Sequence, residues 1–461
     1  MKKTIIILIL ISSVTNLLPA QKYGTGLNFN DDKYKSVQKK APLTRSLYTN
    51  IPSSYSLKKY TPVPKSQGQF GTCVGWSTAY AGMTILESIN KNRTNTEEIT
   101  SNTFSPGFVY KQIKNSTDTW CQLGSSISDA LEILKTKGVC KYSDMTEVNC
   151  PAYLSPSLFS KASSYKIKDY AKIFGLFDSK DFKTAAVKKS ISQNNPVIIG
   201  MNTPESFYAA KEEWNPTETS SLTYGGHAMC VIGYDDNKYG GAFEIMNSWG
   251  TQWGNEGYIW ISYENFHKFV KYAYEMINFR TSQTNNEFSL AGSIKFIKAD
   301  GTQSKAVYDN DIYKLTEPYK SGTLFRLYIS NSVPAYVYAF GYDATKKTFT
   351  IFPYDKSISP ALNYAKNDVA IPDEDRYIQT DNTTGKDYLC VLYSKEKLDI
   401  EKIKSEIENT YGSFKDRVFY VLKDKLVPVE NIDFSQENIS FKVMNSQKNI
   451  VALITETVHI N

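Results

Sequence analysis

The placement of tryptophan divides this chain into two parts. All six tryptophans lie before residue 261, and none follows it. The polar stretch 281–286, Thr-Ser-Gln-Thr-Asn-Asn, comes soon afterwards and has the composition of a linker. A chain of 461 residues is long enough for about two to three domains of ordinary size. We therefore predict one domain over residues 52–280, the linker over 281–286 and a second domain over 287–461.

The N-terminus is typical of a secretory signal peptide over residues 1–20. Two lysines precede a short apolar stretch over residues 4–10, and the small residue Ala20 stands before Gln21. A transmembrane anchor would need about 20 apolar residues, and polar residues interrupt this run too early. We expect cleavage after Ala20 and a mature chain, without a transmembrane anchor, that is secreted or periplasmic. Residues 21–51 are polar and lack a sustained period, so they predict an extended leader or short pro-segment.

The overall composition excludes several classes of protein. Hydrophobic residues make up 41% of the chain and charged residues 22%, values typical of a folded protein rather than a disordered one. The formal net charge is only +6, and no dense run of lysine or arginine occurs, so we expect no nucleic-acid partner. There are six cysteines, too few for a disulfide scaffold.

Five of the six cysteines have structural explanations. Cys230 and Cys390 lie in apolar runs and are predicted to be buried strand residues. Cys121, Cys140 and Cys150 fall within 30 residues, so one pair among them is plausible, with one cysteine left over. A zinc site is not expected, because the chain has no Cys-x-x-Cys spacing and no histidine lies nearby.

Cys73 follows a glycine-rich loop at the start of a predicted helix. Thr72 is a residue type suited to a helix N-cap. A cysteine in the first helical turn lies beside unpaired backbone N–H groups and the positive end of the helix dipole, which favour the thiolate. We therefore predict that Cys73 is a nucleophile, with a core cysteine as the alternative. The helix itself is predicted from apolar residues near helical spacing, at Val74, Ala81, Ile85 and Ile89.

His227 and Asn247 complete a candidate catalytic set. His227 follows two glycines and precedes an apolar strand, whereas His267 and His459 lack such a setting and are interpreted as incidental. Asn247 ends another apolar run, so its amide could hold one ring nitrogen of His227 while the other faces Cys73. Nucleophile, base and orienting group would then be in place.

Taken in order along the chain, these motifs resemble the papain family of cysteine peptidases over residues 52–280. Gln67 and Cys73 match that family's oxyanion glutamine and nucleophile, and Gly226-His227-Ala228 matches its base. Asn247-Ser248-Trp249-Gly250 matches its orienting asparagine, with a tryptophan that could shield the Asn-His hydrogen bond. The resemblance implies a two-lobed α+β catalytic domain that hydrolyses peptide bonds through a Cys-His-Asn triad and a covalent acyl-enzyme. It implies no metal or cofactor, and a peptide or protein substrate.

Substrate-binding residues are also implied by the resemblance. The segment 121–124, Cys-Gln-Leu-Gly, is similar to the family's Cys-x-Gly-Gly, whose backbone pairs with substrate. Gly124 is therefore expected to keep those hydrogen bonds, and Leu123, which takes one glycine position, to narrow specificity. Trp249 is expected at the same cleft.

The family's pattern is not followed everywhere. Phe70 stands where the usual disulfide partner of Cys121 would be, so Cys121 must pair elsewhere, with Cys150 as one option, or stay free. Val74 follows the nucleophile where the family commonly has tryptophan, and Trp76 comes two positions later. The leader is far shorter than the family's helical pro-segments. Either the enzyme is made active, or the leader restrains it in some other way.

The second domain is predicted to be mostly β and sandwich-like. Aromatic and polar residues alternate over 336–342, a turn follows, and 348–352 alternates again, which predicts a β-hairpin. One amphipathic helix is predicted near residue 400, with Ile400, Ile403 and Ile407 on one face. The domain resembles a bacterial β-rich module of uncharacterised function. Its 14 tyrosines indicate sheet packing or a binding face, the latter for a cell-surface or protein ligand.

Two other functions remain open on the same sequence. The first is a peptide ligase, transpeptidase or exopeptidase on the same fold. The second is a non-catalytic peptide-binding relic, in which the replacements at Val74 and Leu123 have closed the cleft. The complete set of Gln67, Cys73, His227 and Asn247 favours the endopeptidase over the relic.

Overall fold

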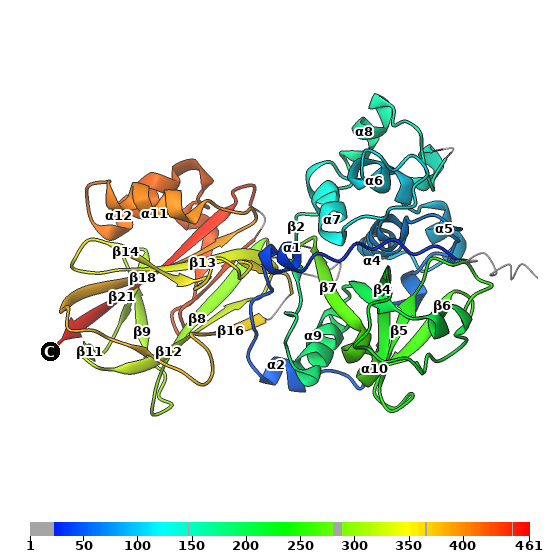
Figure 1. Ribbon diagram of the computed structural model, residues 1–461. Coiled ribbons are helices and arrows are strands. Elements are labelled where there is room, and N and C mark those ends of the chain that lie inside the picture. The colour runs from blue at the N-terminus through cyan, green and yellow to red at the C-terminus, as the bar shows by residue number, and fades with distance from the viewer. Residues whose placement is uncertain (1–22, 146, 280–287, 365–366, 445) are drawn as a thin grey trace, which may run out of the picture.

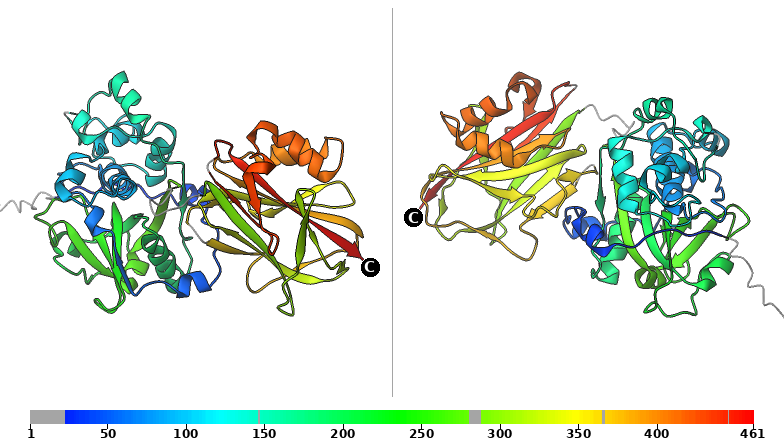
Figure 2. Two further views of the ribbon diagram at one scale, coloured as in Figure 1. Left: turned by 180° about the vertical axis from the view of Figure 1, so that it is seen from behind. Right: turned by 45° about the horizontal axis from the view of Figure 1, so that its top comes forward.

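The computed structural model describes residues 23–145, 147–279, 288–364, 367–444 and 446–461. The predicted signal peptide and the predicted linker over 281–286 lie outside these residues. Two domains lie side by side, and the leader crosses the first before it reaches the second (Figure 1). Two further views show the same arrangement (Figure 2). Within the described ranges, no helix combines the length and the apolar character that crossing a bilayer would take.

The upper half of the first domain in Figure 1 is helical. Its central helix begins at Cys73 and continues to Asn90, with π-type hydrogen bonding in the middle stretch. Thr72 is the N-cap residue, as predicted, but its side chain makes no capping hydrogen bond, because φ −106° and ψ 11° are not the extended angles that favour one. The helices are α3 (Cys73–Gly75), the π-helix η2 (Trp76–Met83), α4 (Thr84–Asn90), α5 (Thr96–Ser101), α6 (Pro106–Ile113), α7 (Ile127–Thr136), η3 (Tyr142–Asp144) and α8 (Pro156–Ala162).

The lower half is a seven-stranded antiparallel sheet in the order β2-β7-β3-β4-β5-β6, with β1 on β4. His227 lies inside strand β4 rather than before it, because β3 pairs with β4 as far as Thr203 with Gly225. The two-lobed α+β fold is thereby confirmed. The elements are β1 (Ser54–Ser56), η1 (Lys58–Tyr60), β2 (Asp169–Lys172), α9 (Lys180–Ser192), β3 (Val197–Thr203), η4 (Glu205–Ala209), β4 (Gly225–Asp235), β5 (Ala242–Met246), β6 (Tyr258–Ser262), α10 (Tyr263–Phe269) and β7 (Val270–Ile277).

The second domain consists of two sheets packed face to face, which confirms the prediction of a mostly β fold. The eight-stranded sheet has the order β14-β13-β18-β21-β10-β9, with β11 on β21 and β15 on β13, and the six-stranded sheet has the order β16-β12-β8-β20-β19, with β17 on β12. A buried apolar core separates them. The predicted hairpin is the antiparallel pair β13 and β14. The strands are β8 (Leu290–Lys298), β9 (Ala306–Asp309), β10 (Ile312–Leu315), β11 (Tyr319–Lys320), β12 (Leu324–Asn331), β13 (Ala335–Tyr342), β14 (Thr348–Phe352), β15 (Ala361–Leu362), β16 (Asn367–Ile371), β17 (Ile378–Gln379), β18 (Gly385–Ser394), β19 (Ile432–Phe434), β20 (Ser440–Val443) and β21 (Ile450–Ile460).

Two helices, α11 (Ile400–Glu408) and α12 (Phe414–Leu422), cover the outer face of the eight-stranded sheet (Figure 1). The apolar face of α11 was predicted, and Ile407 on that face is wholly buried. Helix α12 was not predicted, although Ser413 and Asp416 form a capping box at its start. The turns η5 (Lys423–Lys425) and η6 (Val429–Asn431) follow.

The leader is built into both domains. Helix α1 (Asp31–Ser36) packs on the first domain through Tyr34, which is 1% exposed and stacks on Tyr272 with ring centroids 4.3 Å apart. Beyond it the Lys39 N–H donates to the Ser357 carbonyl oxygen of the second domain at 2.6 Å. Ala41 is part of the second domain's core. Helix α2 (Ser46–Thr49) then leads back to the first domain.

A buried ion pair fixes the leader where the domains meet. Lys40 Nζ lies 2.9 Å from Glu275 Oε2, and Glu275 is wholly buried. Glu275 also accepts hydrogen bonds from the hydroxyl of Ser190 at 2.7 Å and from the Tyr364 hydroxyl of the second domain. Because a buried carboxylate needs a counter-ion, this part of the leader is a structural component of the junction.

The six cysteines form one disulfide and leave four free thiols. Cys121 and Cys150 are bonded, which is one of the pairings left open by the sequence, and Cys140 is the cysteine left over. Cys230 in β4 and Cys390 in β18 are free and buried, as predicted.

Candidate active site

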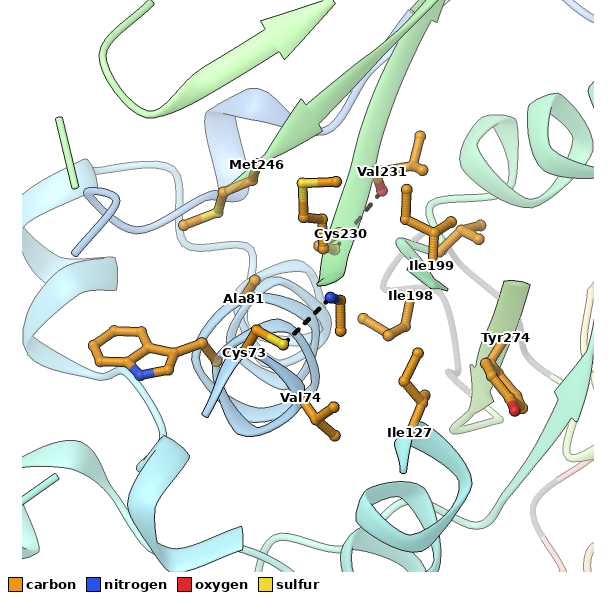
Figure 3. Packing of buried hydrophobic residues seen from close by; sticks show 14 of the residues in the cluster. Cys73, Val74, Ala81, Ile127, Ile198, Ile199, Cys230, Val231, Met246 and Tyr274 are labelled. Atoms are coloured by element: carbon orange, nitrogen blue, oxygen red, sulfur yellow. Dashed lines mark hydrogen bonds between the residues drawn. The ribbon is translucent and has the colours of Figure 1, made fainter. Parts of the chain in front are cut away.

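Cys73 lies at the start of the central helix, where the helical half meets strand β4. Figure 3 shows its sulfur turned toward the strand that carries Cys230 and Val231. The Ala228 N–H donates to Cys73 Sγ at 3.4 Å, and Cys73 is wholly buried. Because Ala228 directly follows His227, the two candidate catalytic residues are neighbours although 154 positions separate them in sequence.

His227 and Asn247 are joined by a hydrogen bond of 2.7 Å between Nε2 and Oδ1. Asn247 Oδ1 also accepts from the Ser248 N–H at 2.7 Å, so it is an acceptor and the imidazole Nε2 is the donor. His227 Nδ1, which then carries the lone pair, is buried and has no hydrogen-bond partner among the described residues. Trp249 stacks on the imidazole with ring centroids 4.7 Å apart and covers the hydrogen bond.

Gln67 is held from both ends of its amide. Its Oε1 accepts from the Ser248 hydroxyl at 2.6 Å, while its Nε2 donates to the Phe70 carbonyl at 2.8 Å. The same Nε2 lies 3.5 Å from the carbonyl oxygen of Thr25, in the leader. Ser248 therefore touches both Gln67 and Asn247. Sequence reasoning placed Ser248 in a motif but gave it no role.

Burial disfavours the charged forms of both Cys73 and His227 in this state. It raises the pKa of the Cys73 thiol to about 12. It also lowers the pKa of His227 to about 4, against the opposing effect of the hydrogen bond to Asn247. Desolvation therefore acts against the thiolate that the helix start is expected to favour.

The first described residues of the leader lie in the cleft between the helical and strand-rich lobes (Figure 1). On the strand-rich side the N–H groups of Gly26 and Leu27 both donate to the Gly226 carbonyl, at 3.1 and 2.9 Å. The Trp249 indole N–H donates to the Gly24 carbonyl at 2.8 Å. The residue that covers His227 thus also binds the leader.

On the helical side the leader pairs in parallel with Ser125. The Ser125 N–H donates to the Gly26 carbonyl, and the Asn28 N–H donates to the Ser125 carbonyl, both at 2.9 Å. The Gly124 N–H donates to the Tyr110 hydroxyl at 3.1 Å rather than to the leader, and the expectation that Gly124 bonds a substrate stays a prediction. Ser125, the next residue, was not singled out from the sequence.

Gly124 and Gly226 have no side chains, which allows the backbone of the leader to lie directly against them. A Cβ on Gly124 would collide with the Gly26 carbonyl, and a Cβ on Gly226 would collide with that of Leu27. The Leu123 side chain is 54% exposed, and its carbonyl accepts from the Asn28 side chain at 2.9 Å.

Leu27 fills an apolar pocket beside the cleft and is only 4% exposed. A Cβ on Gly200 would lie 2.7 Å from a methyl group of Leu27, and the same point is 3.4 to 3.5 Å from Tyr272 and Ile127. Gly200, Tyr272 and Ile127 therefore form the pocket's walls. The sequence carried no signal for them, because they come from β3, β7 and α7 and meet only in the fold.

Within the described ranges, no group of three or more His, Cys, Asp or Glu side chains is arranged to hold a metal ion. The polar groups at the cleft can instead supply a nucleophile, a base, an orienting amide and an amide donor. Such a set suits acyl transfer.

Comparisons with known proteins agree with this chemistry. Residues 51–277 match the family described as "Papain family cysteine protease", and residues 318–397 match a "Domain of unknown function (DUF4384)". An uncharacterized peptidase C1-like protein of Acanthamoeba polyphaga mimivirus is 26% identical over 46% of this chain and 70% of its own length. Cysteine proteinase 3 of Entamoeba histolytica is 26% identical over 45% of this chain and 61% of its own. Xylellain, a cysteine protease from Xylella fastidiosa, aligns in structure over 56% of this chain and 96% of its own, with 21% identity and a TM-score of 0.45.

Proposed function

Because residues 51–277 belong to the papain family of cysteine proteases, we propose that this chain is a secreted cysteine endopeptidase that its own leader holds inactive. The family membership makes it a cysteine-type peptidase. The catalytic roles, the endopeptidase mode, the secretion and the latency are our proposals.

One observation carries the endopeptidase mode. A length of polypeptide, residues 23–28, lies extended along the cleft with backbone hydrogen bonds to both lobes. The chain continues past it into helix α1, whereas its other end lies two positions from the predicted mature start at Gln21. The cleft is therefore open to a continuing chain at the α1 end, which supports cleavage in the interior of a chain over removal of residues at that end. The ligase and relic alternatives have no comparable observation in their favour.

We assign the chemistry as follows. Cys73 Sγ attacks the peptide carbonyl carbon, and the developing oxyanion receives hydrogen bonds from Gln67 Nε2 and the Cys73 N–H. His227 Nδ1 takes the thiol proton and gives it to the leaving amine, while Asn247 holds Nε2–H in place. Water, activated by His227, then releases the acyl-enzyme as acid and free thiol.

In this proposal the peptidase is inactive while the leader is bound, because Cys73 and His227 are then shielded from water. The leader fills the cleft beside Cys73, and with the leader in place burial opposes the charged forms of both Cys73 and His227. Removal of the leader would admit water, so that the thiolate and imidazolium could form as a pair. The Thr25 carbonyl, now 3.5 Å from Gln67 Nε2, would leave that amide to the substrate.

Secretion is supported by two features. The first 20 residues have the pattern of a signal peptide. A disulfide between Cys121 and Cys150 suits an oxidising compartment, either periplasmic or extracellular.

The test compares three proteins. The first begins at residue 21, the second begins at Asn30, and the third is the second with Cys73→Ala. The start at Asn30 keeps Lys40 and Ala41, which the fold needs. We expect the second protein alone to cleave an end-blocked peptide in its interior. Cleavage only of unblocked peptides, or residual cleavage by the Cys73→Ala protein, would refute the proposal.

A further inference from the structure

The second domain contains a cavity that the peptidase chemistry does not use. Its volume is about 480 Å³, within the range of small-molecule sites. It lies between the two sheets, with Phe296 and Phe325 from the six-stranded sheet on one side and Leu389 from the eight-stranded sheet on the other. The walls are mostly apolar and unusually aromatic.

The mouth of the cavity carries exposed aromatic rings. Phe349 is 48% exposed and Tyr354 is 46% exposed, although both are large and one is wholly apolar. Phe349 lies over Gly341, and a Cβ there would collide with its ring. Large rings left open to water at the mouth of a cavity are typical of a ligand site.

The described charged side chains that line the cavity are all acidic. Three carboxylates line the cavity, Asp343, Asp381 and Asp387, and among the residues that the structure describes no lysine, arginine or histidine does. Asp343 and Asp381 accept hydrogen bonds from threonines two residues further on. Asp387 differs, because one oxygen lies 3.2 Å from the buried His459 while the other, Oδ1, is buried without a hydrogen-bond partner in the described part of the chain.

The surroundings of Asp387 disfavour its negative charge. Burial raises the pKa of this carboxyl, and the charges of Asp343 and Asp381 act in the same direction, against the opposing effect of His459. A cation placed near the three carboxylates would relieve this repulsion. Rings with exposed faces also stabilise a cation.

We propose that this cavity binds a small organic cation, an ammonium group on an apolar body, with the body against Phe296, Phe325 and Phe349 and the ammonium beside Asp387. The three unbalanced carboxylates select the charge, and the aromatic walls select the apolar body. The site is independent of Cys73 and His227, so it does not rest on the proposed peptidase mechanism. It gives the second domain a binding function.

The test uses the full mature chain with Cys73→Ala, which prevents self-cleavage. Three probes of similar shape are compared by titration calorimetry: 2-(1-naphthyl)ethylammonium, 3-(1-naphthyl)propanoate and 2-(1-naphthyl)ethanol. We expect the ammonium to bind at least about tenfold more tightly than the carboxylate or the alcohol. Equal affinity for all three, or binding by none, would overturn the proposal.

Variants locate the binding. Asp387→Asn is expected to weaken the ammonium probe at least about fivefold, and Asp433→Asn, a carboxylate on β19 that does not line the cavity, is expected to leave it unchanged. If Asp387→Asn proves unfolded by thermal melt, Phe349→Ala replaces it, because a residue that is 48% exposed loses less buried surface on truncation than a core residue does. Unchanged affinity in whichever of the two is folded would overturn the proposal.

Discussion

The Trp249 indole N–H donates a 2.8 Å hydrogen bond to the Gly24 carbonyl, so the side chain that stacks on His227 also binds the leader. Departure of the leader therefore removes a contact from the wall of the catalytic site itself. In the described state burial raises the pKa of the Cys73 thiol and lowers the pKa of His227. Single substitutions in the leader can therefore test how tightly it binds in the cleft.

The first prediction concerns the apolar anchor of the leader. Leu27→Asp would bury a carboxylate between Gly200, Ile127 and Tyr272, where no partner awaits it, so the leader should leave the cleft. We expect hydrolysis of an end-blocked peptide by the full mature chain to rise at least about tenfold. The control Asp32→Asn alters an exposed leader side chain that pairs with Lys35 of the same helix, and it should change the rate little. Equal rates for the two variants would contradict this role of Leu27.

The second prediction concerns pH. In a chain with Cys73→Ala, which cannot form the thiolate–imidazolium pair, the bound leader lowers the pKa of His227 from 6.5 to about 4, chiefly by burial, whereas in the open cleft we expect the ordinary value. Between pH 6.5 and pH 4 the open form binds a proton at His227, whereas the closed form does not. Leader binding is therefore strongest above pH 6.5 and weakens as pH falls from 6.5 toward 4. Asp31 acts in the same direction only at lower pH: burial would raise its pKa, but hydrogen bonds from Tyr272 and Lys271 hold it below 3.8.

The measurement uses a synthetic peptide of residues 21–37 and a chain that begins at residue 38. This chain carries Cys73→Ala, so that only the imidazole titrates. We expect the peptide to bind more than about tenfold more weakly at pH 5 than at pH 7. Adding His227→Gln should remove most of that difference. A pH dependence that survives the added substitution would assign it to other groups.

The third prediction concerns stability. Lys40→Met leaves the wholly buried Glu275 without its counter-ion, so we expect a loss of about 3 to 5 kcal/mol in the free energy of unfolding. The matched control is Lys33→Met, also in the leader, which breaks a solvent-exposed pair with Asp129 and should cost less than about 1 kcal/mol. Denaturant titration of both variants measures the two losses in the free energy of unfolding. Similar small losses would mean that Lys40 is not needed at the junction.

How far the sequence alone predicts this site depends on the kind of contact involved. Cys73, His227 and Asn247 could be predicted to meet, because glycines or apolar runs surround each of them in the sequence. The path of the leader could not, because it is held by backbone hydrogen bonds, such as those of Gly26 to Gly226, that leave no sequence pattern. Leu27 is one apolar residue in a polar segment, and its pocket exists only after folding.

The same limit applies at Ser125 and Thr72. The leader pairs with the backbone of Ser125, and residue types do not reveal which backbone groups will pair. Thr72 is a residue type suited to a cap and stands at the cap position, but its backbone angles do not suit a side-chain cap. In the second domain the strand pattern was clear, whereas helix α12 carries only a short apolar repeat.

The fourth prediction concerns Ser248, a positioning residue. Its hydroxyl holds Gln67 Oε1 at 2.6 Å, so Ser248→Ala should let the Gln67 amide drift from the oxyanion. In the chain that begins at Asn30 we expect kcat to fall about tenfold with KM nearly unchanged, and Gln67→Ala to lower kcat by about 100-fold or more. A change in KM alone would instead place Ser248 in substrate binding.

The central claim is that Cys73 is an activatable nucleophile covered by the leader. It is tested most directly by intact-mass labelling with an epoxysuccinyl cysteine-peptidase inhibitor at pH 7. The account predicts little labelling of the chain that begins at residue 21, a single adduct on the chain that begins at Asn30, and none when the latter carries Cys73→Ala. An adduct that persists in the Cys73→Ala protein, or equal labelling with and without the leader, would contradict it.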